Sequence, residues 1–192
     1  MQLILASSSQ YRRQLLETLG LAFEVRVPDI DESPSIDEAP RQLVARLAQA
    51  KARAVGNGST VELIIGSDQT AAVDGIFLTK PGNAQHAVEQ LQQLSGRTVT
   101  FFTGLCLYNT GTGRAQLSVE PYTVTLRSLT DSQIEAYVQR DQPFDNAGAF
   151  RSEGLGIALF ERLEGEDPNT LVGLPLIRLV EFLGNEGIDV LA

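Results

Sequence analysis

Residues 3–16, LILASSSQYRRQLL, carry the signal for the fold and raise the first question about function. The stretch begins as an apolar run, changes into three serines, and continues with two adjacent arginines inside a helical pattern. A buried strand that leads directly into a helix is the basic unit of an α/β sheet. The start of such a helix also offers backbone N–H groups and a positive dipole end, which together suit a phosphate group.

Outward from this stretch, strand and helix patterns alternate along the chain. The strand patterns cover residues 2–6 and 23–27, residues 61–81 as two short strands around an Asp-Gly turn, and residues 98–129 as a long hairpin. The helical patterns cover residues 9–20, 40–55, 83–96 and 131–140, and Pro175 is positioned to begin a last helix. Because no linker or repeat marks a boundary, the sequence predicts a single α/β domain, residues 1–192, with a twisted mixed sheet flanked by helices.

The charge balance is strongly acidic, with 24 aspartates and glutamates against 15 lysines and arginines and a net charge of −9. This balance argues against binding of nucleic acid or of an anionic membrane, and a polyanionic ligand would need a local basic pocket. No apolar run approaches the ~18 residues that a membrane span requires. The one cysteine, Cys106, is expected to be a buried thiol, which fits a reducing compartment and a cytoplasmic protein.

The motif around the three serines is the first candidate for binding phosphate. Ser7 follows the predicted strand, and Arg12 and Arg13 add forked donors near the start of the helix. The same residues fit a plainer interpretation, in which the serines cap the helix and the arginines lie solvated on its outer face. The motif alone leaves both interpretations open.

The stretch IIGSDQTA, residues 64–71, is the second candidate. An apolar strand that ends in residues 66–69 puts a carboxylate and an amide at a strand exit, where open α/β sheets collect their ligands. Asp68 could bind a divalent cation or take a proton from water. The alternative is an aspartate that caps a turn.

The acidic loop after the second predicted strand is the third candidate, through Asp29, Asp31 and Glu32. A loop carboxylate that meets Asp68 would make a plausible Mg²⁺ site, although a solvated loop is the alternative. Lysines are scarce, since Lys51 and Lys80 are the only two in the chain.

Eight motifs follow one another along almost the whole chain: LILASSSQYRRQLL, PDIDES, LAQAKA, IIGSDQTA, TKPGN, LSGRTVTFFTGL, NAGAF and NTLVGLPL. Taken in this order, they resemble the Maf family of nucleotide pyrophosphatases. Within that family the chain is most similar to the branch that hydrolyses 7-methyl-GTP, because residues 152–154 read SEG and residues 160–165 read FERLEG. The P-loop and the Gly-x-Gly-x-x-Gly turn, which bind nucleotides in other folds, are absent from the sequence.

The resemblance implies an elongated α/β fold shared with inosine-triphosphate pyrophosphatases. It implies a divalent cation, Mg²⁺, Mn²⁺ or Co²⁺, and cleavage between the α and β phosphates of a modified nucleoside triphosphate. The expected products are the nucleoside monophosphate and diphosphate, and the expected role is removal of modified nucleotides from the pool. A homodimer is also expected from the family, with neither nucleic acid nor a membrane as a partner.

The resemblance also gives each candidate residue a role. Asp68 matches the catalytic acid, the proton acceptor for the attacking water, and Glu32 together with Asp68 matches the metal-binding carboxylates. The phosphate-handling positions are Ser7, Arg12, Arg13, Lys51 and Lys80, and the positions that set base preference are Tyr11, Gln69 and Glu153.

Base preference has a physical rationale of its own. Methylation at N7 makes guanine cationic, so the aromatic face of Tyr11 stacks on it favourably and the Glu153 carboxylate can accept hydrogen bonds from N1–H and N2–H. Tyrosine stands at position 11 where relatives are expected to carry tryptophan, and the chain has no tryptophan.

Two alternatives to 7-methyl-GTP hydrolysis follow from the same motifs. The first keeps the reaction and changes the substrate to dTTP and UTP. The second is a non-enzymatic, nucleotide-binding regulator of septum formation and cell division.

Overall fold

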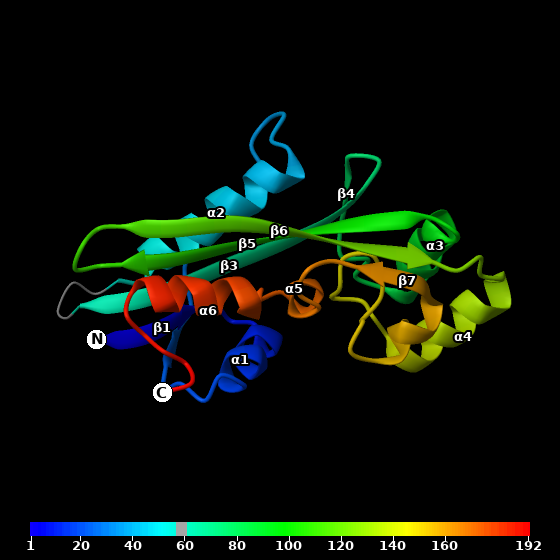
Figure 1. Ribbon diagram of the computed structural model, residues 1–192. Helices are drawn as coiled ribbons and strands as arrows, with labels where there is room; N and C mark the ends of the chain where they lie inside the picture. The colour runs from blue at the N-terminus through cyan, green and yellow to red at the C-terminus, as the bar shows by residue number, and fades with distance from the viewer. Residues whose placement is uncertain (57–60) are drawn as a thin grey trace. The chain divides into compact units, whose positions relative to one another are not determined.

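A single mixed sheet organises the computed structural model, which describes residues 1–56 and 61–192. Within these residues the sheet has seven strands in the order β2-β1-β3-β5-β6-β7, with β4 paired to β3 (Figure 1). Its strands are β1 (Gln2–Ala6), β2 (Glu24–Arg26), β3 (Glu62–Val73), β4 (Ile76–Leu78), β5 (Thr98–Asn109), β6 (Ala115–Leu126) and β7 (Phe160–Glu164). Strand β1 pairs in parallel with β2 and β3, whereas β3–β4 and β6–β7 are antiparallel pairs. The prediction of an α/β fold with a mixed sheet is confirmed.

The longer helices lie where their periodicity predicts them. They are α1 (Gln10–Glu17), α2 (Pro40–Ala54), α3 (Ala84–Leu94), α4 (Asp131–Asp141) and α6 (Leu176–Asn185), joined by a 3-10 helix (Leu155–Leu159) and the short α5 (Asn169–Val172). The predicted starts are confirmed, because Ser9, Asn83 and Thr130 each cap a helix with their side chains and Pro175 precedes α6. No helix in the described part of the chain is long and apolar enough to cross a membrane.

The chain divides into two compact units. Unit 1 comprises Met1–Gln69, Phe102–Glu120 and Asp167–Ala192, and unit 2 comprises Thr70–Phe101 and Pro121–Glu166. The long strands β3, β5 and β6 contribute residues to both units. The prediction of one domain over residues 1–192 stays a prediction.

Each unit has its own apolar core. In unit 1, leucines from β1, α1 and α6 pack together, and the Cys106 thiol is fully buried as predicted. In unit 2, the Phe150 ring packs edge-on against Phe101 at 5.6 Å and Phe160 at 4.9 Å between ring centroids.

Strand β3 runs past the predicted strand exit. The two strands predicted around the Asp-Gly turn are confirmed as β3 and β4, whereas the exit predicted at residues 66–69 is wrong, because β3 continues to Val73 before it turns back into β4. The turn itself is as expected, with Asp74 and Gly75 both at positive φ, 50° and 79°. Asp68 therefore lies inside a strand, where Lys51 supplies the partner that a buried carboxylate needs.

Helix α2 packs on the sheet at unusually short range. A Cβ atom at Gly66 of β3 would lie 2.1 Å from the Ala48 carbonyl oxygen, and one at Gly104 of β5 would lie 2.2 Å from the Val44 carbonyl oxygen. Only glycine fits at either position. This close approach sets the side chains of α2 directly against the middle of β3.

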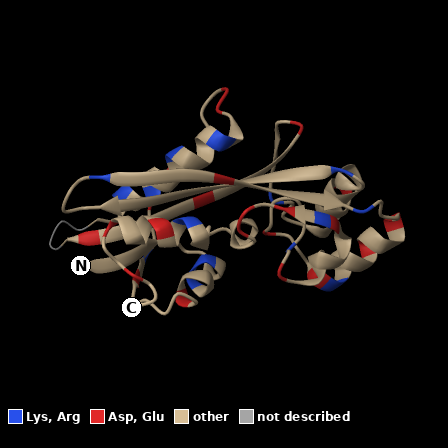
Figure 2. Ribbon diagram, viewed as in Figure 1, with Lys and Arg blue, Asp and Glu red and all other residues tan. Residues whose placement is uncertain are grey.

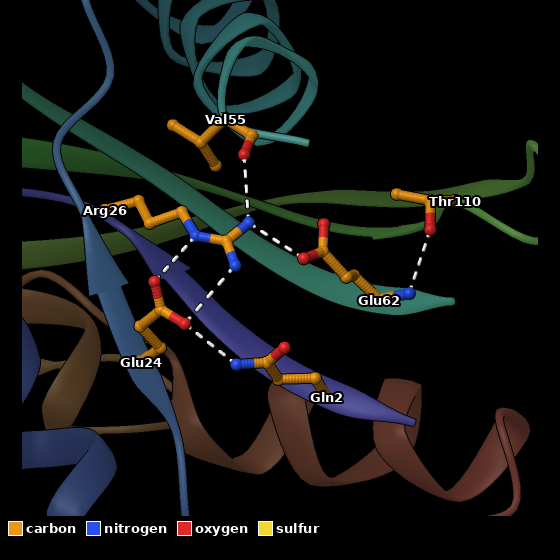
Figure 3. Close-up of polar contacts among 6 residues, drawn as sticks. All are labelled: Gln2, Glu24, Arg26, Val55, Glu62 and Thr110. Atoms are coloured by element: carbon orange, nitrogen blue, oxygen red, sulfur yellow. Dashed lines mark hydrogen bonds and ion pairs between the residues drawn. The ribbon is translucent and has the colours of Figure 1, made fainter. Parts of the chain in front are cut away.

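The edge strand β2 is anchored by Arg26 (Figure 3). Its Nη1 donates to Glu62 Oε1 at 2.8 Å and to the Val55 carbonyl oxygen at 3.2 Å, and its Nε donates to Glu24 Oε1 at 2.8 Å. The Glu62 side chain is completely buried, so the guanidinium compensates a charge that water cannot reach. Arg26 thereby ties a three-residue strand to β3 and to the end of α2.

Candidate active site

Asp68 and Lys51 form a buried ion pair at the contact between β3 and α2. Lys51 Nζ donates to Asp68 Oδ1 at 2.7 Å, and only 7% and 11% of the two side chains are exposed. Both residues stand on elements whose close packing is fixed by glycine. The fold brings together two residues that are 17 positions apart in the sequence.

Glu32 adds a second carboxylate to the same ammonium group. It lies between β2 and α2, and its Oε1 is 2.8 Å from Lys51 Nζ. Its side chain is 57% exposed, in contrast to Asp68. The structure thus brings together the two predicted metal-binding carboxylates, with Lys51 between them.

The surroundings of Asp68 suit a group that accepts a proton. Burial is the main influence and raises the pKa of Asp68, while the charges of Lys51 and Arg12 lower it and that of Glu32 raises it further. A raised pKa makes the carboxylate a stronger base, and the nearby cations favour its ionised form. Lys51 occupies Oδ1, and among the described residues Oδ2 has no hydrogen-bond partner.

Arg12 supplies positive charge close to both carboxylates. Ser9 caps α1 by accepting from Arg12 N at 3.3 Å, and the Arg12 side chain donates through Nε to the Gly173 carbonyl oxygen at 2.8 Å. Burial lowers the pKa of Arg12, and the charges of Asp68 and Glu32 oppose this effect. Arginine stays charged even so. Figure 2 shows the basic residues of α1 and α2 as blue segments of the two helices.

Ser67 and Gln69, the neighbours of Asp68 on β3, hold the segment around α5. Ser67 Oγ lies 2.9 Å from both the Gly104 and the Gly173 carbonyl oxygens. Gln69 Nε2 donates to the Thr170 and Leu171 carbonyl oxygens at 2.7 and 3.1 Å, and to the hydroxyl of Thr103 at 2.9 Å. The amide of Gln69 is therefore engaged with the protein itself, and its predicted part in base preference stays a prediction.

Three further parts of the site were not predicted from the sequence: Ser67, Thr103 and the α5 segment. Thr103 also donates to the Thr170 carbonyl oxygen, at 2.9 Å. Only their positions in the sequence could have indicated them, because Ser67 stands next to Asp68 and α5 lies inside the motif NTLVGLPL.

Three other predicted residues lie on or before α1. Ser7 is buried, and its Oγ accepts from Ser9 N at 3.1 Å, which orders the turn into the helix. Tyr11 is 37% exposed. The Arg13 guanidinium is exposed and pairs with Glu17 at 2.9 Å one helical turn away, as the plainer interpretation of the motif expects. The structure therefore does not bring Arg13 into contact with the carboxylates, and its phosphate role stays a prediction.

The remaining two predicted residues, Lys80 and Glu153, belong to unit 2. Lys80 follows β4 and is exposed. Glu153 precedes the 3-10 helix, is also exposed, and accepts from Ser152 Oγ at 3.0 Å. Their roles stay predictions.

The donor chemistry of the site can be compared with the needs of a divalent cation. In residues 1–56 and 61–192 no group of three or more His, Cys, Asp or Glu side chains could hold a metal ion. Mg²⁺, however, commonly binds through one or two carboxylates and completes its shell with waters and substrate phosphates. Glu32 and Asp68 fit that smaller donor set. Asp31 serves the loop instead, since its Oδ1 accepts from Ser33 N at 2.9 Å.

Comparison with known proteins covers nearly the whole chain. The family model described as Maf-like protein matches residues 2–186. A protein of Nitrosococcus oceani named 7-methyl-GTP pyrophosphatase is 57% identical over 189 residues, which are 98% of this chain and 95% of that protein. Proteins with the same name from Methylobacillus flagellatus and Idiomarina loihiensis are each 53% identical over 189 residues. These alignments cover 98% and 97% of this chain, and 98% and 96% of the two relatives.

The match therefore spans both units, all the predicted site residues and the α5 segment that was not predicted from the sequence. More than half of the aligned positions are identical in each of the three relatives. The resemblance inferred from eight short motifs is confirmed, and this chain belongs to the Maf-like protein family.

Proposed function

We propose that this protein is a nucleoside triphosphate pyrophosphatase that hydrolyses 7-methyl-GTP to 7-methyl-GMP and diphosphate. The names of its full-length relatives support the substrate and the reaction. The observation that carries the chemistry is Asp68, a buried carboxylate paired with Lys51 through one oxygen. Removal of a modified nucleotide from the pool is the corresponding role in the cell.

In the proposed reaction, Asp68 Oδ2 accepts a proton from a water molecule as the water oxygen attacks the α-phosphorus. A bond forms between that oxygen and phosphorus, and the bond from the α-phosphorus to the oxygen that bridges to the β-phosphate breaks. Diphosphate leaves with the bonding electron pair. Lys51 favours the ionised form of Asp68 before the reaction, and Arg12 stabilises negative charge on the phosphate oxygens.

A divalent cation, Mg²⁺, Mn²⁺ or Co²⁺, is the proposed cofactor, and Glu32 and Asp68 would hold it. When bound, such a cation neutralises phosphate charge and polarises the phosphoryl group. Lys51 contacts both carboxylates and so keeps them close together.

Base selection is proposed for Tyr11 and Glu153. A cationic 7-methylguanine favours an aromatic face and a carboxylate over the neutral amide that would suit other bases. Ser7, Arg13, Lys80 and Gln69 complete the proposed set for phosphate and base binding. The proposed location is the cytoplasm, and the proposed assembly is a homodimer, which size-exclusion chromatography with light scattering would test.

The deciding experiment measures diphosphate release from 7-methyl-GTP, GTP, dTTP and UTP, with and without Mg²⁺. We expect 7-methyl-GTP to be preferred, and Asp68→Asn to lower kcat by about 10²- to 10⁴-fold, the usual contribution of a general base. Asp189→Asn, a change at an exposed aspartate of unit 1, is the matched control and should keep full activity. Absence of diphosphate release from every triphosphate would overturn the proposal.

A second variant tests the base preference separately. Glu153→Gln should reduce turnover of 7-methyl-GTP more than turnover of the other triphosphates. An equal loss on all of them would contradict the base-selecting role, and a preference of the unaltered protein for dTTP and UTP would favour the other branch of the family.

A further inference from the structure

The carbonyl group of Gly173 is an acceptor that Arg12 and Ser67 of the candidate site both contact. Arg12 Nε donates to it at 2.8 Å, and Ser67 Oγ lies 2.9 Å from it. Gly173 follows α5 and is 161 positions away from Arg12 in the chain. One backbone oxygen therefore contacts the side chain of a proposed phosphate-binding residue and the neighbour of Asp68.

Gly173 meets two requirements that other residues cannot. Its φ of 119° and ψ of 12° lie in a left-handed conformation that L side chains rarely adopt. A Cβ atom would also lie 3.3 Å from Arg12 Nε, tighter than an ordinary contact. A side chain at this position would thus strain the backbone and press on the guanidinium.

The segment around Gly173 is fixed from both of its ends. The buried Asp167 accepts from Asn169 N at 2.8 Å through Oδ1 and from Ile177 N at 2.9 Å through Oδ2, which joins α5 to α6. Between these points, Gln69 holds the carbonyl groups of Thr170 and Leu171. The Gly173 carbonyl oxygen is therefore a rigid acceptor.

A rigid acceptor at Nε determines how Arg12 presents its remaining donors. The guanidinium is planar, so fixing Nε and the aliphatic stem also fixes the plane of Nη1 and Nη2. Within the described residues, Nη1 and Nη2 make no hydrogen bond, while the charges of Asp68 and Glu32 act on the same group. The protein thus fixes the orientation of the Nη1–Nη2 edge of the guanidinium, which can donate to two phosphate oxygens.

We propose that Gly173 is a positioning residue, whose carbonyl oxygen orients the Arg12 guanidinium so that Nη1 and Nη2 bind the phosphate groups of the substrate. The proposal rests on the proposed function, because it takes Arg12 as a phosphate ligand. Ordering a long side chain before the substrate arrives lowers the entropy lost on binding. Loss of this order weakens substrate binding more than it slows the chemical step.

The test compares Gly173→Ala with Gly187→Ala. Gly187 also lies in unit 1 at positive φ, 81°, but a Cβ there meets no atom within 4 Å. We expect Gly173→Ala to raise KM by about tenfold or more, as for loss of a hydrogen bond to a charged group, with a smaller change in kcat. Gly187→Ala should keep the wild-type KM.

A double-mutant cycle separates positioning from general damage. If Gly173 acts through Arg12, then Gly173→Ala should change KM by less than about twofold in an Arg12→Lys background, where no Nε–H is present. The same increase in both backgrounds would overturn the proposal. Arg12→Lys alone should raise KM about as much as Gly173→Ala does, which keeps the test decisive if the glycine variant does not fold.

A spectroscopic readout makes the test independent of turnover. The Nε–H NMR signal of Arg12, assigned by its loss in Arg12→Lys, should exchange slowly with solvent in the unaltered protein and quickly in Gly173→Ala. Calorimetric titration with inorganic pyrophosphate should show weaker binding in the same variant. If no triphosphate is hydrolysed but these two results hold, the proposed function fails and the positioning role stands. Wild-type exchange in Gly173→Ala would overturn the positioning role.

Discussion

The folded chain compensates the negative charge of the Asp68 carboxylate only in part. Burial raises its pKa, and the cations Lys51 and Arg12 do not fully oppose that effect. The folded state therefore binds this proton more tightly than the unfolded chain does. By linkage, the stability of the folded state falls as pH rises from the ordinary pKa of the carboxyl through the raised one.

The first prediction concerns this fall in the stability of the folded state with rising pH. Relative to the unaltered protein, Asp68→Asn should gain stability as pH rises through the pKa of Asp68, because only the unaltered protein must then bury a charged carboxylate. This gain should shrink as pH is lowered through the pKa of Asp68, since the carboxyl group is then neutral as well. Melting curves of both proteins across a range of acidic to neutral pH would measure it. A difference in melting temperature that does not vary with pH would contradict this explanation.

Gln69 carries the second prediction at the scale of single residues. Gln69→Glu would replace the donor to the carbonyl groups of Thr170 and Leu171 with a carboxylate, so the two N–H donors that serve three acceptors are lost. At about 1 kcal/mol for each donor, the free energy of unfolding should fall by roughly 2 kcal/mol. Chemical denaturation would measure the loss. Gln93→Glu on the exposed side of α3 is the control, and an equal, small effect in both variants would exclude an anchoring role for Gln69.

At the scale of elements, the contact of α2 with the sheet determines the site. Gly104→Ala would place a Cβ atom 2.2 Å from the Val44 carbonyl oxygen, so α2 must shift away from β5. We expect a loss of about 3 kcal/mol or more in stability, at the upper end for overpacking because the clash is with backbone. Activity should fall as well, since the shift moves Lys51 relative to Asp68.

The matched control for this prediction is Gly184→Ala. Gly184 lies in α6, and a Cβ there meets nothing within 4 Å, so alanine should be neutral or stabilising by up to about 1 kcal/mol. Thermal melting and diphosphate release would be measured on both variants. A Gly104→Ala protein with unaltered activity would show that the exact seating of α2 is unimportant for the site.

The helices and the hairpins could be predicted from sequence because their signals are local. Neighbouring residues determine the capping box of Thr130 and Gln133 and the Asp-Gly turn after β3. Short α5 could not be predicted, because the polar groups of its residues are satisfied by partners that are distant in the sequence. Gln69 reaches across 101 positions to Thr170, and Arg12 across 161 to Gly173.

The same distinction applies to the candidate site. A resemblance between motifs was enough to select Asp68, Lys51 and Glu32, which the structure brings into direct contact. It could not separate Arg12 from Arg13, although the two are adjacent. Their difference arises from helical geometry, which turns Arg12 toward Gly173 and leaves Arg13 beside Glu17 in solvent.

At the scale of the whole molecule, the two units share three strands. Because β3, β5 and β6 contribute residues to both, neither unit can lose its part of the sheet without disturbing strands of the other. We therefore expect one cooperative unfolding transition. Hydrogen exchange followed by mass spectrometry would test this, and peptides from the two units should open with the same free energy. Two well-separated midpoints would contradict it.

The burial of Cys106 has a practical consequence for studying this protein. The only thiol in the chain is inaccessible, and burial raises its pKa to about 11, so it is almost wholly protonated at neutral pH. Maleimides and disulfide reagents act on exposed thiolates and would leave the native chain unlabelled. A single cysteine introduced on the surface of either unit would then be the only reactive thiol. Two introduced cysteines would carry a pair of fluorophores or spin labels, and the buried Cys106 would not need to be replaced.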